Sequence, residues 1–591
     1  MKVLRRVTVA IVALSFFLCA AVQAQGIKQL PANPMLVIKM NNPEGISKKL
    51  SDWATKLGLG QFDPAFGDPL GALKKQLNIK EGLDSKGEVV VGIYESPQPG
   101  DEPLVVALLP ISDYKAFLGN LANLKTEGEI SSFTLPDEQE PFYAVNWGNF
   151  AAITPTKDLL TKKPEGVEVT GSGAKQLDAN DVTVYANMKV ISAKALPKFR
   201  ESRGMVLGGL EGELKRNPQM NAKYVPIIKV VVNQVLNGAE QFLTDSQSAT
   251  FGINITPQGI TTSLQAEFTP DSYCGKNVAM IKNSNASLTT GLPARKYFAF
   301  GGSVMDPKTT TKFLEDMLGP IQKELATLGD DAKGFSTAID SVKATLSAVE
   351  GFSFGYVQPT AIGQQSIIQA VMVYDGDAKK ISDGERAYMQ ASADIFKLMP
   401  QAPGMSMAME VKPAAKTVDG TALDQFSMKF NFDKNTPEAA QAQQMITMMY
   451  GPGGLNGYMG ALSDRNYLMT MGGDDELLTA ALQSAKKKED SLSQTDLVKS
   501  ISSQLPKDRA IVYYVALDNI ATTVLDFMGQ MGFKIPLKLP EMSPIGISMS
   551  TEGSVIRVDT AISSDMIEKM VSAGMQAAMM MQNPGGKRGG L

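Results

Sequence analysis

Few residues in this chain have the types and spacing that catalysis requires. The 591 residues include no histidine, which excludes Ser-His-Asp and Cys-His catalysis, histidine acid–base chemistry and histidine-ligated metal sites. Two cysteines, Cys19 and Cys274, are too few for a four-cysteine zinc or iron–sulfur site. The sequence also has no Walker or Rossmann glycine motif. We therefore predict no catalytic residues, no metal site and no cofactor.

The remaining polar motifs are weak candidates. The Ser-x-x-Lys spacing of some Ser–Lys enzymes occurs at Ser112/Lys115, Ser172/Lys175 and Ser484/Lys487, and three unrelated occurrences indicate chance. Two acidic clusters offer oxygen ligands for calcium, Asp375-Gly376-Asp377 and Asp474-Asp475-Glu476. Neither completes an EF-hand loop, and the second opens a predicted helix, where acidic residues suit the helix dipole. Paired carboxylates can hydrolyse glycosides, but the sequence singles out no pair.

Methionine is the most unusual residue type, with 32 in the chain and most of them after residue 286. Met405, Met407 and Met409 alternate and would share one face of a strand, as would Met469 and Met471. The first interpretation is that these flexible apolar side chains fill a core. The second is an adaptable apolar groove, lined by the same five methionines, for a lipid, a peptide or a partner. A copper site built from thioethers alone is a third interpretation.

The elements that must position such residues recur along the chain. Leu-Pro-Ala precedes an apolar run at Leu30 and again at Leu292, Leu505-Pro506 precedes another, and Leu177-Asp178-Ala179 is a looser version. A recurring phrase of this kind predicts an internal repeat, which affects every later assignment of the fold.

A second phrase recurs with the first, a strand with a central glycine. Leu30 lies 62 residues before Gly92, and Leu292 lies 63 residues before Gly355. The other two glycine strands contain Gly252 and Gly546, and each of the four is followed by a turn and a returning strand, which predicts hairpins. We interpret the glycines as sites where a helix or another backbone approaches closely, or as bulges in a curved sheet.

Capping signals predict helices after these strands. Asn42 and Pro43 open a predicted helix over 43–57, with Gly58 at its end. Asp306-Pro307 opens one that should run to Leu318, before Gly319. Ser112-Asp113 should open a third over 114–124.

These patterns predict an α+β fold of four strand–helix–hairpin–helix copies, arranged as two tandem-duplicated lobes. We place the lobes at residues 25–285 and 286–580, and a flexible Gly-rich tail at 581–591. Because the strands arrive as hairpins, the sheets should be mostly antiparallel and covered by helices on one face.

The first 24 residues predict export. Lys2, Arg5 and Arg6 precede an apolar segment, and Val22-Gln23-Ala24 is typical of a cleavage site. The mature chain would begin at Gln25 and act in the periplasm or outside the cell. No later segment has the length and apolarity of a membrane span. The acidic balance, −4 for the whole chain, argues against a nucleic-acid partner.

Three motifs carry a family resemblance. They are Leu30-Pro31-Ala32 before a strand, Gly87-Glu88-Val89-Val90-Val91-Gly92, and Leu108-Leu109-Pro110-Ile111-Ser112-Asp113 at a helix start. With the predicted signal peptide, they resemble a group of large exported bacterial proteins that carry a repeated domain of unknown function. The resemblance implies a scaffold of repeats and no activity or site residues.

Three functions remain open. The first is a non-catalytic protein of the cell envelope that binds a partner or serves as a scaffold. The second is a carrier of a lipid or another apolar ligand in the methionine-lined groove. The third is a hydrolase that uses carboxylates only.

Overall fold

The computed structural model describes residues 26–61, 63–96, 102–135, 139–161, 165–167, 169, 171–216, 225–360, 366–398, 405–432, 437–451, 454–530, 532–533 and 537–582. The predicted signal peptide, residues 1–24, lies outside this part of the chain, and so do residues 583–591 of the predicted tail. The last helix, α16 (Ser564–Gln582), includes the first two residues that the sequence assigned to the tail.

The chain divides into two compact units, each built of helices and antiparallel strands. The first unit takes the described residues of Met1–Lys198, Phe242–Gly275 and Ser554–Asp559. The second takes those of Phe199–Gln241, Lys276–Gly553 and Thr560–Leu591.

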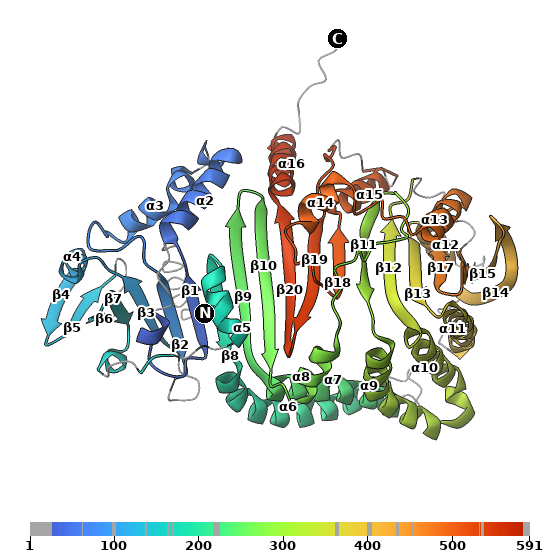
Figure 1. Ribbon diagram of the computed structural model, residues 1–591, viewed down its shortest axis with the longest axis horizontal. Helices are drawn as coiled ribbons and strands as arrows, with labels where there is room; N and C mark the ends of the chain where they lie inside the picture. Colours follow the sequence, from blue (N-terminus) through green and yellow to red (C-terminus); the bar gives the residue numbers. More distant parts are fainter. Residues whose placement is uncertain are drawn as a thin grey trace, which may run out of the picture. The chain divides into compact units, whose positions relative to one another are not determined.

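The strands of the first unit pair in the order β4-β5-β6-β7-β3-β2-β1-β8-β9-β10, and each of these pairs is antiparallel (Figure 1). Their bounds are β1 Leu36–Met40, β2 Val89–Tyr94, β3 Leu104–Pro110, β4 Ala122–Glu127, β5 Ile130–Thr134, β6 Phe142–Trp147, β7 Phe150–Thr154, β8 Val182–Asn187, β9 Ser246–Thr256 and β10 Gly259–Phe268.

The second unit repeats this order with ten added to each strand number. Its strands pair as β14-β15-β16-β17-β13-β12-β11-β18-β19, again antiparallel, and the part of β20 from Thr560 onward belongs to the same unit (Figure 1). Their bounds are β11 Tyr297–Val304, β12 Val349–Val357, β13 Gln369–Gly376, β14 Met405–Val418, β15 Thr421–Phe432, β16 Leu455–Ala461, β17 Asn466–Met471, β18 Ile511–Val515, β19 Ile545–Glu552 and β20 Val555–Ser563.

The central strands of each sheet are buried on both faces, and the expectation of helices on one face is therefore wrong. In β2, Val89 and Val91 belong to a core with the helices α2 (Pro43–Lys56), α3 (Pro69–Gln76) and α4 (Tyr114–Leu118). Val90 and Tyr94 belong to a second core, which includes Leu177 of α5 (Gly171–Ala179). All six residues of β2 are buried. The strand has no polar face for this reason, as is usual for strands covered on both sides.

The second unit has the same two-sided arrangement. One core contains Val371 and Val373 with the helices α13 (Asp475–Lys487) and α14 (Asp496–Ser502). The other contains Tyr374 and Tyr467 with α11 (Ala378–Leu398).

In each unit, a Leu-Pro phrase and a glycine strand are joined by the same contact, a hydrogen bond from a tyrosine to the proline carbonyl. The hydroxyl of Tyr94 donates to the carbonyl of Pro31 at 2.8 Å, and that of Tyr297 donates to the carbonyl of Pro293 at 2.7 Å. A Cβ on Gly92 would lie 2.7 Å from the Tyr94 hydroxyl, and one on Gly355 would lie 2.3 Å from the Tyr297 ring. The glycines therefore make room for a tyrosine, where we expected a backbone approach or a bulge.

The remaining glycine strands follow the same principle. A Cβ on Gly252 would meet the Asn180 side chain at 2.3 Å, and one on Gly546 would meet Ile501 at the same distance. In all four strands the space above the glycine holds a side chain.

The predicted helix starts are confirmed more often than the predicted ends. Asn42, Asp113 and Asp306 each cap a helix through the side chain, and α2 ends one residue before its predicted end. The helix after Asp113 stops at Leu118 and is followed by β4, so the expectation of helix to residue 124 is wrong.

The helix after Asp306, α9, runs through Gly319 and Pro320 to Thr327, beyond its predicted end. A proline inside a helix leaves the carbonyl four residues earlier without its usual N–H partner. That carbonyl belongs to Asp316, and it accepts a hydrogen bond from the side chain of Gln234 in α7 (Val225–Asp245) at 3.4 Å.

Candidate functional site

The predicted methionine set lies mainly in a packed core. Met469 is buried, and Met409 and Met471 pack against the same cluster, which includes Ile381 and Met389 of α11. Met407 is half-buried, opposite Phe430 of β15. The backbone of Met405 pairs with Phe432. These positions support core filling, and the groove stays a prediction.

The Ser-x-x-Lys motifs have structural partners. Ser172 donates to Glu267 at 2.8 Å, and Ser484 donates to Glu489 at 3.3 Å. Lys487 pairs with Glu489 at 3.5 Å. The hydroxyls of Ser172 and Ser484 thus bind carboxylates.

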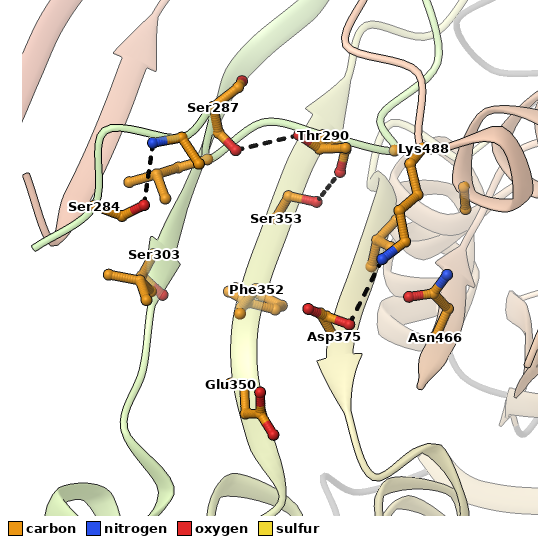
Figure 2. A pocket seen from close by; sticks show the side chains of 17 residues that line it. Ser284, Ser287, Thr290, Ser303, Glu350, Phe352, Ser353, Asp375, Asn466 and Lys488 are labelled. Atoms are coloured by element: carbon orange, nitrogen blue, oxygen red, sulfur yellow. Dashed lines mark hydrogen bonds and ion pairs between the residues drawn. The ribbon is translucent and has the colours of Figure 1, made fainter. Parts of the chain in front are cut away.

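The acidic residues of the two predicted clusters have separate contacts in the structure. Asp474 caps α13 by accepting from the N–H of Leu477 at 2.9 Å, as the helix interpretation expected. Asp377 accepts from the N–H of Lys380 at 3.1 Å near the start of α11, and this backbone bond contributes most to lowering the pKa of Asp377. Asp375 points elsewhere, into a cavity of the second unit (Figure 2).

This cavity has a volume of about 280 Å³ and lies where several separate segments meet. Its floor is formed by β12, the end of β13 and the start of β17, and its walls are the segment 284–291 and the end of α13 (Figure 2). The polar residues that line it are Ser284, Ser287, Thr290, Ser303, Glu350, Ser353, Asp375, Asn466 and Lys488.

The wall formed by residues 284–291 is held in place by specific contacts. Asp490 accepts from the Ser287 hydroxyl at 2.7 Å and is 3.2 Å from that of Thr289. Ser353 donates to the carbonyl of Thr290 at 2.8 Å. A Cβ on Gly302 would lie only 1.7 Å from the carbonyl oxygen of Leu288, so only glycine lets this segment pass over β11 at this point.

Four charged groups lie in or beside the cavity. Lys488 approaches Asp375, with Nζ 3.8 Å from Oδ1 (Figure 2). Arg465 contacts Glu350 at 2.7 Å and Asp375 at 3.6 Å. Because 3.8 Å exceeds hydrogen-bonding distance, the Lys488 ammonium keeps its donors available to a ligand.

Asn466 is the buried polar group of the site. Its side chain lies beside Asp375 (Figure 2), and the residue is 9 % exposed. Its backbone N–H donates to Ser463 at 3.1 Å and its carbonyl accepts from Leu462 at 2.8 Å. Within the described ranges its amide side chain makes no hydrogen bond. Its amide atoms are not among the fully buried polar atoms that lack a partner, so they are reached from the cavity and can bond a ligand there.

A second group of polar residues lies on the opposite face of this sheet, below α11. Burial raises the pKa of Glu385 to about 7. Burial also raises the pKa values of Tyr374 and Tyr467, and the charge of Glu385 adds to both effects. Beside them Arg386 contacts Asp424, which also accepts from the N–H of Ala414 at 2.9 Å.

Two searches across the described residues gave negative results. No group of three or more acidic or cysteine side chains is placed to hold a metal ion in the described ranges. None of the described helices combines the length and apolarity needed to cross a membrane.

Asp375 is the one cavity residue that the sequence singled out. The others come from segments up to 204 residues apart, from Ser284 to Lys488. The available signal was the adjacent pair Gly301-Gly302, since one of these glycines makes room for the segment that forms a cavity wall.

Comparisons with known proteins identify no family for this chain. No protein-family model and no curated protein matches the sequence. One solved structure, crystal form III of TP0453, aligns over 49 % of this chain and 99 % of its own at 7 % identity. Its TM-score of 0.17 is too low to support an argument about fold or function.

Proposed function

We propose that this protein is an exported, non-catalytic binding protein of the cell envelope, and that the cavity of the second unit is its ligand site. The observation that carries the proposal is Asn466, a buried amide without a hydrogen bond of its own that opens onto this cavity. A ligand that enters the cavity can bond this amide, which offers two donors and an acceptor. Export rests on the predicted signal peptide.

We infer a tandem duplication as the origin of the two units. The strand orders agree label by label, and the Tyr–Pro contact over a glycine occurs once in each sheet. The aligned spacing of Leu-Pro and glycine strand in the sequence supports the same origin. Four copies of one smaller unit, and kinship with the exported repeat proteins that the motifs resemble, are extensions of this inference.

Native mass spectrometry of the full mature chain tests the binding function. We expect a fraction of the protein purified from the periplasm to carry a small bound molecule that is released on denaturation. Asn466→Leu should reduce that fraction several-fold, because the side chain loses its amide and keeps a similar volume. The control substitution must leave both the cavity and the fold intact. Asn283→Leu does not qualify, because it would remove two hydrogen bonds between Asn283 and Thr551. Lys487→Gln leaves the cavity lining unchanged and serves instead.

The same measurement separates the alternative functions. A bound lipid that persists in Asn466→Leu and is lost in Met407→Gln would favour the carrier with a methionine-lined groove. A protein free of any adduct under conditions that preserve weak complexes would contradict the binding function and leave the scaffold role.

The hydrolase alternative has one supporting observation, because Glu350 and Asp375 line the same cavity. Each carboxylate is about half exposed and faces Arg465. Turnover of an aryl glycoside by the wild type, abolished in both Glu350→Gln and Asp375→Asn, would replace the binding function with this one.

A further inference from the structure

The two sheets can be compared position by position from their strand pairing. Gly92 pairs with Val37 and Val106, and Gly355 pairs with Phe300 and Val371. Counting outward from these glycines along the ladders assigns each cavity residue of the second unit a counterpart in the first. The counterparts of Gly302, Gly351, Ser353, Asp375 and Asn466 are Lys39, Glu88, Val90, Pro110 and Phe150.

In the first unit these positions are filled. Lys39 is 1 % exposed and contacts Glu88 at 3.0 Å and Asp178 at 2.5 Å. A Cβ on Gly26 would meet Val90, Glu88 and Phe150, all within 3.2 Å. Gly26 itself donates its N–H to Glu88. A buried ion pair, an aliphatic side chain and an aromatic ring thus occupy this region.

In the second unit the same positions hold small or polar residues. Lysine and glutamate are replaced by Gly302 and Gly351, valine by Ser353 and phenylalanine by Asn466. The second unit therefore has a polar pocket, accessible from outside, where the first unit is filled by side chains.

The charges of the cavity balance, which limits the ligand. Lys488 and Arg465 face Asp375 and Glu350, two positive groups against two negative ones, and the carboxylate of Asp490 behind the wall accepts from the hydroxyls of Ser287 and Thr289. A ligand with net charge would leave one of these groups uncompensated in a half-buried site. A neutral molecule with several hydroxyl groups avoids this, because each hydroxyl both donates and accepts. It could accept from Lys488 and donate to Asp375 while bonding Asn466.

Size sets a second limit. The volume of about 280 Å³ falls just under the range of roughly 300–1,000 Å³ that is usual for pockets holding drug-sized ligands. A single sugar ring or a short sugar alcohol fits this limit, and a disaccharide exceeds it.

We propose that the cavity of the second unit binds a small neutral polyhydroxy compound, a monosaccharide or sugar alcohol, in the space that Lys39, Glu88, Val90 and Phe150 fill in the first unit. This inference rests on the proposed binding function and names the ligand class for the same site. The segment 284–291 and Lys488 form the walls around the ligand, and Asp375 and Asn466 form the floor beneath it.

Saturation-transfer NMR and calorimetry on the full mature chain test the ligand class. The probes are glucose, galactose, mannose and mannitol, with glutamate and lysine as compounds that carry a net charge. We expect saturation transfer to at least one neutral probe. The double variant Ser353→Val/Asn466→Phe, which copies the residues of the first unit, should abolish it.

Lys488→Gln provides a variant that does not depend on repacking the core, because Lys488 is 56 % exposed. Loss of a charged hydrogen-bond donor should weaken binding about tenfold or more. The matched control is its neighbour Lys487→Gln, which lies outside the cavity lining and should bind as the wild type does.

The outcomes distinguish the two proposals. Absence of binding to all four neutral probes at millimolar concentration overturns the ligand class, and so does binding that the double variant and Lys488→Gln leave unchanged. Binding of glutamate or lysine alone, lost in the same variants, also overturns the ligand class but preserves the binding function of the site.

Discussion

A hydrogen bond from a tyrosine hydroxyl to a proline carbonyl accounts for the two motifs that recur most clearly in the sequence. These motifs are the Leu-Pro phrase and the strand with a central glycine. The bonds from Tyr94 to Pro31 and from Tyr297 to Pro293 are alike, but the tyrosines come from different strands. Tyr94 follows its glycine by two residues in β2, whereas Tyr297 lies in β11, beside the strand of Gly355. What the two units share is therefore the space above the glycine and the carbonyl beyond it.

Gly355→Ala tests whether that space is required. The new Cβ would lie 2.3 Å from the Tyr297 ring, and we expect a loss of about 1–3 kcal/mol in the free energy of unfolding from overpacking. Gly319→Ala in α9 is the matched control, because a Cβ there meets nothing within 4 Å. That substitution should stabilise the helix by about 0.5–1 kcal/mol. Equal effects of the two substitutions on thermal unfolding would contradict the assignment.

The sequence revealed these residues but not their contact. Leu-Pro and the glycine strands were visible because they repeat, and β2 was visible as an apolar run. The tyrosine contact joins residues 63 apart in one unit, and 4 apart in the other, so no fixed spacing reveals it. The same holds for the cavity. In the sequence, Asp375 is a candidate only because Asp377 lies close to it, and no motif includes Asn466.

At the scale of elements, the predictions failed where local signals conflict with tertiary contacts. The strand β4 has six exposed side chains, so it lacks the apolar alternation that predicts a strand. The strand β16 contains Gly457, whose missing Cβ makes room for the Phe426 ring, and glycine argues against a strand in sequence. Helix α9 continues past Pro320 because Gln234 of another helix bonds the freed carbonyl.

The helix α11 gives the protein a group that titrates near neutral pH. Glu385 has a pKa of about 7 in the fold against an ordinary value of 4.5. The folded state therefore favours the protonated carboxyl, and its contribution to stability is full below about pH 4.5 and is lost as the pH rises through 7. The chain has no histidine, so few other groups compete in this range.

Glu385→Gln should remove this pH dependence, because glutamine stays neutral. We expect the variant and the wild type to unfold at similar temperatures near pH 5, and the variant to be more stable at pH 8 by up to about 3 kcal/mol. The matched control is Asp383→Asn, on the exposed side of α11. A stability difference between Glu385→Gln and wild type that is constant from pH 5 to 8 would show that Glu385 does not titrate there.

At the scale of the whole molecule, the two units share one strand order but differ in how the same region of the sheet is filled. The first unit closes the region around Gly26 with the Lys39–Glu88 pair, and the second leaves the corresponding region open and polar. A duplicated scaffold can diverge in this way, since the contact that both sheets share lies apart from the positions that differ. Function is then expected where the copies differ, and the cavity is such a place.

The predicted export would have its own consequence for the whole chain. Cleavage after Ala24 would remove Cys19 and leave Cys274, whose thiol pKa is raised to about 12 by burial and by the nearby charge of Asp245. The thiolate is the reactive form, so at pH 8 the native thiol should react slowly with a disulfide reagent such as DTNB.

Protein recovered from the periplasm should show one thiol per chain in guanidinium, and an intact mass that corresponds to a chain beginning at Gln25. Ala24→Asp should block cleavage and yield two thiols. Two thiols in the wild-type protein, or fast reaction of the folded chain, would contradict the cleavage site or the burial of Cys274 respectively.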